Sequence, residues 1–212
     1  MKINQHISEL KPSATLLIIE KVKELSNTGQ EITHFGFGQS PFPIHQSIVE
    51  ELKKNATNNH YLPVNGLEQL RKQVSIFLSE HQGIQRASDL IFIGPGSKEL
   101  LYQSVLIFEG EFLIPKGSWV SYIPQIKSKG GSYRILETTL ENNFKLTPSV
   151  LESYLSNSQV QKHILVLNSP NNPTGAVYSD AEYQSLATIC RKHKILVLSD
   201  EIYSQINFSN EY

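Results

Sequence analysis

The feature that most limits the possible folds of this chain is a series of short apolar segments after residue 90. Each has four residues and is separated from the next by a longer segment with helical patterning. The segments are Leu90–Ile93, Phe112–Pro115, Tyr133–Leu136, Ile164–Leu167 and Ile195–Leu198. Continuous apolar strands that alternate with helices are typical of a mainly parallel sheet covered on both faces. We therefore predict an α/β fold with three layers, in which helices cover both faces of the sheet.

The residues before this series have a different pattern, which predicts three helices. Ser13–Ser26 has an apolar residue at every third position and is therefore amphipathic. Residues 44–56 form the second predicted helix and residues 67–81 the third, which Gly83 ends.

Two helices within the later series carry signals for where they begin. Pro148 follows Thr147, and proline is favoured at the first position of a helix. Ser179 and Glu182 have the spacing of a capping box, in which each side chain binds the backbone of the other residue.

These patterns suggest two parts of unequal size. Residues 1–43 are predicted to form an N-terminal arm and part of a small domain, and residues 44–212 are predicted to form one large domain. The strand Ile195–Leu198 has no later strand to follow it in the sequence. We therefore expect the large domain to be incomplete.

Composition and charge exclude several classes of protein. The formal net charge is -1 and no run of lysine and arginine occurs, so we expect neither nucleic acid nor a membrane as a partner. The single cysteine, Cys190, rules out an internal disulfide framework, and the scattered histidines predict no metal site. The N-terminus lacks a secretory signal, and its apolar segment Leu16–Ile19 is too short to span a bilayer. We expect a cytoplasmic protein.

Three polar loops follow predicted strands, and this is the edge at which α/β proteins bind ligands. The first loop, Gly94–Glu99, has the sequence GPGSKE. Its glycines allow close approach of a ligand, and the N–H groups of Ser97 and Lys98 open the next helix, where a phosphate is favoured. A tight turn with a serine cap explains the same residues, so both interpretations stay open here.

The second loop, Asn168–Gly175, has the sequence NSPNNPTG and follows the strand Ile164–Leu167. Its two prolines make it stiff, and a stiff loop is useful when an amide must be held against a ligand. The third loop begins at Ser199 and contains Asp200 and Tyr203. A buried carboxylate at a strand end needs a partner or a cationic ligand, although a helix cap would also explain it.

Taken together, these motifs resemble those of the class I/II aminotransferases, which are pyridoxal-phosphate enzymes of fold type I. The order and spacing agree along nearly the whole chain, and NNPTG and SDEIY are the specific strings. The motifs are GPGSK, the Trp119–Tyr122 segment, NSPNNPTG, SDEIY, the Lys11–Thr15 segment, the GQSPFP turn and the Tyr61–Gly66 loop. The resemblance implies that the α/β sheet is part of the cofactor-binding large domain of such an enzyme.

The resemblance implies roles for residues on the first loop and beyond it. Gly96, Ser97 and Lys98 would hold the phosphate of pyridoxal phosphate through backbone amides. Trp119 would stack on the pyridine ring.

The other two loops would bind the ring itself. Asn172 and Tyr203 would both hydrogen-bond the ring oxygen of the cofactor, and a cis bond between Asn172 and Pro173 is implied. Asp200 would pair with the protonated pyridine nitrogen and so keep the ring cationic. These roles predict one pocket at the carboxyl edge of the sheet, formed by Ser97, Trp119, Asn172, Asp200 and Tyr203.

The resemblance also implies substrates and an assembly. Gly38 would leave room for the carboxylate of the substrate, and the substrates would be an amino acid and a 2-oxo acid. Tyr61 would reach the phosphate of a neighbouring subunit, so a homodimer is expected for a full-length protein.

One expected catalytic residue is missing. In this family the Schiff-base lysine follows the equivalent of Asp200 by a few tens of residues, but only twelve residues follow here and none is lysine. We therefore expect an N-terminal fragment that is inactive by itself, with no catalytic residue of its own. The motifs leave open a lyase or decarboxylase of the same fold, or a non-catalytic remnant.

Overall fold

The computed structural model describes residues 3–12, 14–33 and 42–206. The chain forms two compact units. One unit comprises Lys11–Ile93, and the other combines Met1–Leu10 with Gly94–Tyr212. The predicted boundary between residues 43 and 44 stays a prediction.

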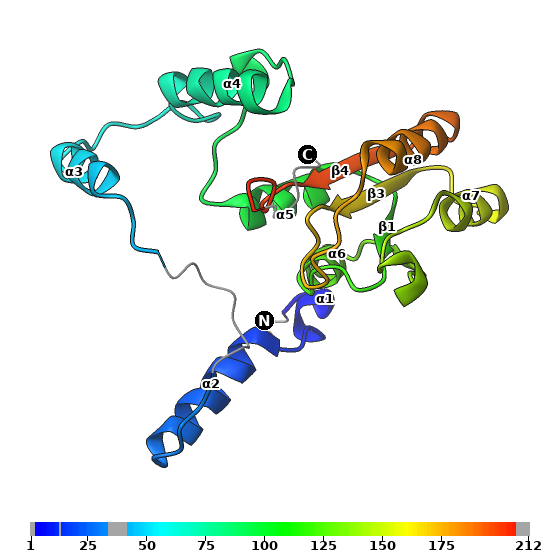
Figure 1. Cartoon of the computed structure of the whole chain (residues 1–212), viewed down its shortest axis with the longest axis horizontal. Coiled ribbons are helices and arrows are strands. Elements are labelled where there is room, and N and C mark those ends of the chain that lie inside the picture. The colour runs from blue at the N-terminus through cyan, green and yellow to red at the C-terminus, as the bar shows by residue number, and fades with distance from the viewer. Residues whose placement is uncertain (1–2, 13, 34–41, 207–212) are drawn as a thin grey trace. The chain divides into compact units, whose positions relative to one another are not determined.

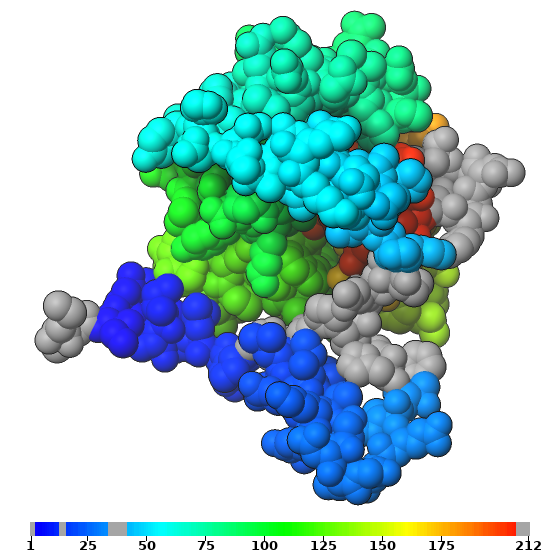
Figure 2. All heavy atoms as spheres, turned by 90° about the vertical axis from the view of Figure 1, so that its left-hand side faces the viewer, coloured from blue at the N-terminus to red at the C-terminus, as the bar shows by residue number. Residues whose placement is uncertain are grey.

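The unit Lys11–Ile93 is helical in its described part. It contains α2 (Ala14–Asn27), α3 (Gln46–Asn55), α4 (Glu68–Gln82) and a short 3-10 turn, η1 (Ser88–Leu90). The three predicted helices are thereby confirmed to within two residues at each end. Gly83 ends α4 in the left-handed conformation, with φ of 65°, as expected for a glycine just beyond a helix. The helix α3 buries none of its residues, and its cyan side chains stand on the surface in Figure 2.

The predicted strand Leu90–Ile93 is wrong. The chain makes the turn η1 there and continues without regular structure to residue 94. The N–H of Ile93 donates to the carbonyl of Asn65 at 3.1 Å, so this segment pairs with a loop. Ile93 also lies so close to Gly66 that a Cβ atom at Gly66 would be 2.5 Å from it. A strand needs a neighbouring strand for its backbone groups, and the described residues between 14 and 93 contain none.

The second unit contains the sheet. Its helices are α1 (Gln5–Ser8), α5 (Ser97–Ile107), α6 (Tyr122–Ser128), α7 (Pro148–Asn157) and α8 (Asp180–Lys192), with a 3-10 turn η2 (Leu140–Asn142). Its strands are β1 (Glu111–Pro115), β2 (Tyr133–Leu136), β3 (His163–Asn168) and β4 (Leu196–Asp200). The strands lie in the order β2-β1-β3-β4 and every pair is parallel (Figure 1). The predicted parallel α/β sheet is confirmed.

Two clusters of buried side chains lie on opposite faces of the sheet. On one face Leu113 of β1 and Leu165 of β3 pack with Leu151 of α7 and Leu186 of α8. This arrangement follows from the alternation of side chains along a strand, which sends neighbouring residues to opposite faces.

On the other face, Phe112 of β1 and Ile164 of β3 pack with Val105 of α5 and with Ile126 of α6. The helices α7 and α8 therefore form one outer layer and α5 and α6 the other. The predicted three-layer architecture is confirmed.

The strand β4 is less buried than its sequence suggests. Leu196 and Val197 keep 42% and 40% of their surface exposed, and Asp200 alone is buried in this strand. In the described sheet β4 has a neighbour on one side only, which is β3. Asn168, the last residue of β3, lies in register with Asp200, the last residue of β4. Polar residues from two of the three loops are thus brought side by side.

Candidate functional site

A cavity of about 110 Å³ lies at the carboxyl ends of β3 and β4, beside the start of α5. It is lined by Ser97, Trp119, Asn168, Asn172, Asp200, Ile202 and Tyr203. All five residues that the sequence predicts to converge line this one cavity, so the predicted pocket is confirmed. Asn168 and Ile202 are additions that the sequence did not single out.

Among the described residues that line this cavity, Asp200 alone carries a charged group, and it is 7% exposed. Its Oδ2 accepts a hydrogen bond of 2.6 Å from the hydroxyl of Tyr122, and its Oδ1 accepts one of 3.2 Å from the N–H of Ile202. Burial, reinforced by the nearby Asp200 carboxylate, raises the pKa of Tyr122 far above its usual range. Tyr122 therefore stays protonated and acts as the donor.

Asn168 joins the second loop to β4. Its side chain is 5% exposed and donates from Nδ2 to the carbonyl of Asp200 at 2.8 Å. Its Oδ1 accepts the N–H of Asn172 at 2.7 Å. One buried amide thus fixes the backbone of two cavity residues. This role of Asn168 was not predicted from the sequence, although Asn168 is the first residue of the NSPNNPTG string and directly follows a predicted strand.

The amide of Asn172 and the hydroxyl of Tyr203 meet inside the cavity. The Asn172 Nδ2 lies 3.5 Å from the Tyr203 hydroxyl oxygen, which makes a long hydrogen bond. The peptide bond between Asn172 and Pro173 is cis, as the resemblance implies, and the bond between Ser169 and Pro170 is cis as well.

The helix α5 directs its N-terminus toward the cavity through Ser97. Its cap, Gly96, has φ of 107°, and the space where a Cβ would stand is open. The first N–H groups of a helix have no partner within it, so this end favours an anion. The carbonyl of Lys98 accepts the side-chain N–H of Gln125 at 2.9 Å, and the Lys98 amine lies 5.4 Å from the ring centre of Trp119.

Comparison with known proteins agrees with this geometry. Residues 30–211 match the family model described as aminotransferase class I and II. The chain belongs to this family. The aspartate aminotransferases of Bacillus subtilis (strain 168) and of Geobacillus stearothermophilus are each 34% identical to it. They align with 100% and 98% of this chain, and with 54% and 53% of their own length.

Solved structures of aminotransferases share the fold. The aspartate aminotransferase of Thermus thermophilus with maleate superposes with a TM-score of 0.89 at 26% identity, over 100% of this chain and 56% of that one. The enzyme of Rhizobium meliloti has a TM-score of 0.90 at 23% identity, over 100% of this chain and 54% of that one, and supports the fold alone. The chain therefore spans about half the length of the relatives it matches.

Class I and II aminotransferases depend on pyridoxal phosphate, and the groups around the cavity fit this molecule. An open helix start suits a phosphate, a tryptophan face suits an aromatic ring, and a buried carboxylate suits a ring nitrogen that carries a proton. The fit rests on the kinds of group that meet in the cavity, where the phosphate, the ring face and the ring nitrogen of the cofactor each have a chemical counterpart.

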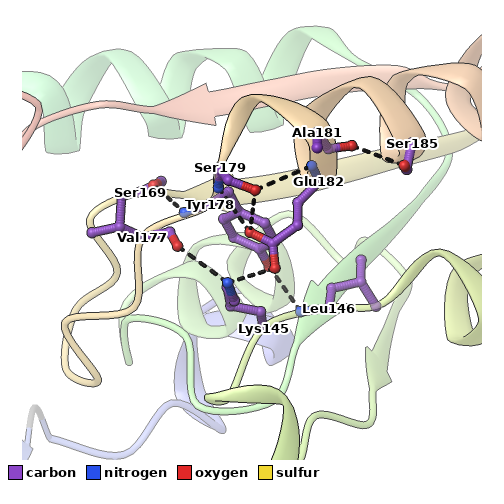
Figure 3. A network of polar contacts seen from close by, with 9 residues as sticks. All are labelled: Lys145, Leu146, Ser169, Val177, Tyr178, Ser179, Ala181, Glu182 and Ser185. Carbon is purple, nitrogen blue, oxygen red and sulfur yellow. Dashed lines mark hydrogen bonds and ion pairs between the residues drawn. The ribbon is translucent and has the colours of Figure 1, made fainter. Parts of the chain in front are cut away.

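Figure 3 shows how this aminotransferase chain anchors the exit of the second loop. Lys145 makes an ion pair of 2.5 Å with Glu182, and the N–H of Leu146 donates to the hydroxyl of Tyr178 at 2.8 Å. Burial raises the pKa of Tyr178 to about 12, although the Leu146 N–H lowers it. Burial would also raise the pKa of Glu182, but Lys145 and the donors of Ser179 outweigh it and lower that pKa.

Four predicted site residues are not among those that line the cavity, namely Gly96 and Lys98, which flank Ser97 at the start of α5, and Tyr61 and Gly38. Tyr61 lies on a loop of the unit Lys11–Ile93, and its side chain is exposed. Gly38 lies outside the described residues. Within the described residues there is no cluster of three potential metal ligands, and no helix there is long and apolar enough to cross a membrane.

Proposed function

We propose that this chain provides the cofactor-binding part of a pyridoxal-phosphate aminotransferase that exchanges amino groups between aspartate and a 2-oxo acid. The single observation that carries the proposal is the cavity, in which a buried carboxylate, an amide, a phenol, a tryptophan and a helix N-terminus meet. Aspartate is the first substrate to consider because it appears in the names of the Bacillus subtilis and Geobacillus stearothermophilus relatives.

The five cavity residues that the sequence predicted each have a definite task in this proposal. When bound, pyridoxal phosphate supplies an electron sink for the bond that breaks at the substrate α-carbon. Asp200 offers a buried anion to the ring nitrogen, which keeps a proton there. Asn172 and Tyr203 donate to the ring oxygen, Trp119 covers the ring face, and the backbone N–H groups at Ser97 receive the phosphate.

Residues 201–212 contain no lysine. Because the resemblance places the covalent lysine after Asp200, we propose that a polypeptide of residues 1–212 binds the cofactor without covalent attachment to one lysine. The same polypeptide should not transfer amino groups. Borohydride reduction followed by peptide mapping tests this statement, and one dominant labelled lysine together with amino-group transfer would contradict it.

The proposed assembly is a homodimer in the cytoplasm, with Tyr61 of one subunit close to the phosphate bound by the other. Size-exclusion chromatography with light scattering measures the subunit number. A Tyr61→Phe variant of the full-length protein should bind the cofactor more weakly without changing that number.

The reaction is tested on the protein encoded by the complete reading frame. We expect an amino group to pass from aspartate to an added 2-oxo acid, with release of the 2-oxo acid that corresponds to aspartate. Release of ammonia would indicate a lyase, and release of carbon dioxide would indicate a decarboxylase. A protein that does not bind pyridoxal phosphate would be a non-catalytic member of the family.

A further inference from the structure

The buried hydroxyl of Tyr122 has no task in the proposed function, yet it makes the shortest contact to the carboxylate of the cavity. Tyr122 is 3% exposed and does not line the cavity itself. Its hydroxyl oxygen lies 2.6 Å from Oδ2 of Asp200. A hydrogen bond to an ionised acceptor is among the stronger ones, and it is stronger still away from water.

Packing on several sides fixes the position of Tyr122. The residue begins α6, and its ring packs in the buried cluster between α5, α6 and the sheet. Its ring meets that of Trp119 edge to face, with centroids 5.4 Å apart and an interplanar angle of 84°. Tyr122 therefore contacts two residues that line the cavity, Trp119 through its ring and the carboxylate of Asp200 through its hydroxyl.

The two oxygens of Asp200 are held by different donors. Tyr122 holds Oδ2 through its side chain, and the N–H of Ile202 holds Oδ1 at 3.2 Å. Two donors on different oxygens fix the plane of a carboxylate, whereas one donor leaves it free to rotate about its Cβ–Cγ bond. Each oxygen keeps a lone pair for a further donor, because a carboxylate accepts about four hydrogen bonds.

We propose that Tyr122 is a positioning residue that fixes the plane of the Asp200 carboxylate and thereby sets how strongly the cavity prefers a ligand ring with a protonated nitrogen. This inference rests on the proposed function, since pyridoxal phosphate is the ligand with such a ring. The raised pKa of Tyr122 supports the direction of the bond, because the hydroxyl keeps its proton throughout the physiological range.

The test compares two ligands that differ at one atom. One is pyridoxal phosphate, and the other is its carbocyclic analogue, in which a CH group replaces the ring nitrogen. Trp119 is the only tryptophan of the chain and lines the cavity, so its fluorescence reports the binding of both ligands. The ratio of the two dissociation constants measures the preference for the ring nitrogen, and a general loss of structure would leave this ratio unchanged.

The variant is Tyr122→Phe, and Tyr154→Phe is its matched control. Tyr154 also donates its hydroxyl to a buried carboxylate, that of Glu111, but at the amino end of β1 and therefore at the opposite edge of the sheet. We expect Tyr122→Phe to lower the preference about tenfold, which corresponds to about 1.4 kcal/mol. We expect Tyr154→Phe to leave it as in the unmodified chain.

Each outcome is decisive. Suppose that the unmodified chain prefers the ligand with the ring nitrogen. If Tyr122→Phe keeps the same ratio of dissociation constants, even with weaker binding of both ligands, the positioning role is overturned and the proposed function stands. If the unmodified chain binds neither ligand, the proposed function fails and the inference fails with it.

A second measurement keeps the inference testable if Tyr122→Phe does not fold. Carbon-13 labelling of the tyrosine ring allows the titration of Tyr122 to be followed by NMR in the unmodified chain and in Asp200→Asn. Burial keeps the pKa of Tyr122 raised in both proteins, but the Asp200 carboxylate no longer adds to it in the variant, so we expect the titration to begin at lower pH there. A Tyr122 resonance that titrates identically in both proteins overturns the inference.

Discussion

Replacing Asn168 by alanine removes the side chain that joins the second loop to β4. Two hydrogen bonds disappear, one to the carbonyl of Asp200 and one from the N–H of Asn172. The carbonyl keeps a second donor, the N–H of Ser169 at 3.4 Å. The N–H of Asn172 is half-buried and loses the acceptor that holds it.

The expected loss of stability follows from this difference. A buried donor left without a partner costs about 1–3 kcal/mol, and a lost bond to an acceptor that keeps another donor costs about 1 kcal/mol. The free energy of unfolding should therefore fall by about 2–4 kcal/mol. If the free energy of unfolding falls by about 2 kcal/mol for each molar of urea, the midpoint of unfolding should fall by about 1–2 M.

Urea unfolding followed by circular dichroism measures this shift. Asn142→Ala is the control, because Asn142 is exposed and its side chain makes one hydrogen bond, to Thr139. The control should change stability by less than about 0.5 kcal/mol. If Asn168→Ala unfolds at the same urea concentration as the control, the loop is not held by this amide and the reasoning is refuted.

Three other outcomes are expected. Ser179→Ala removes the capping box of α8 and should lower the free energy of unfolding by about 1 kcal/mol in urea titrations, while leaving the helix in place. Leu165→Ala opens a cavity in the buried cluster between the sheet and the helices α7 and α8, and should cost about 2–5 kcal/mol in the same measurement. Lys192 and His193 lower the pKa of Glu152 from 4.5 to about 2. The contribution of Glu152 to the free energy of unfolding is therefore complete above pH 4.5 and disappears as the pH falls toward 2. Glu152→Gln should flatten the acid limb of a pH titration of stability within that window.

Local signals in the sequence predicted the elements of the fold well. The proline after Thr147 begins α7, and the pair Ser179 and Glu182 forms the capping box of α8. These signals work because a cap is formed by residues a few positions apart, whose geometry the chain itself determines. The segment Leu90–Ile93 shows the limit of such reasoning, because an apolar run forms a strand only where a neighbour pairs with it.

The candidate site also combines features that the sequence predicted with features that it did not. The motifs identified the lining residues Ser97, Trp119, Asn172, Asp200 and Tyr203, which line one cavity. Tyr122 and Asn168 stand within the same motifs, yet their contacts with Asp200 were not foreseen. Both contacts join residues more than thirty positions apart, and a motif contains no information about which distant atom a side chain reaches.

The sequence by itself determined the alternation of strands and helices, the places where the helices begin, and the residue types that the cavity contains. Those properties depend on the spacing of apolar residues and on local capping, which act over a few residues. Only the tertiary structure decided which side chains hold Asp200 and Asn172 in place. The register that sets Asn168 beside Asp200, and the packing of α6 that brings Tyr122 to its carboxylate, result from the assembly of separate strands and helices. Hydrogen bonds between such distant segments form only when the whole sheet and its helical layers are packed together.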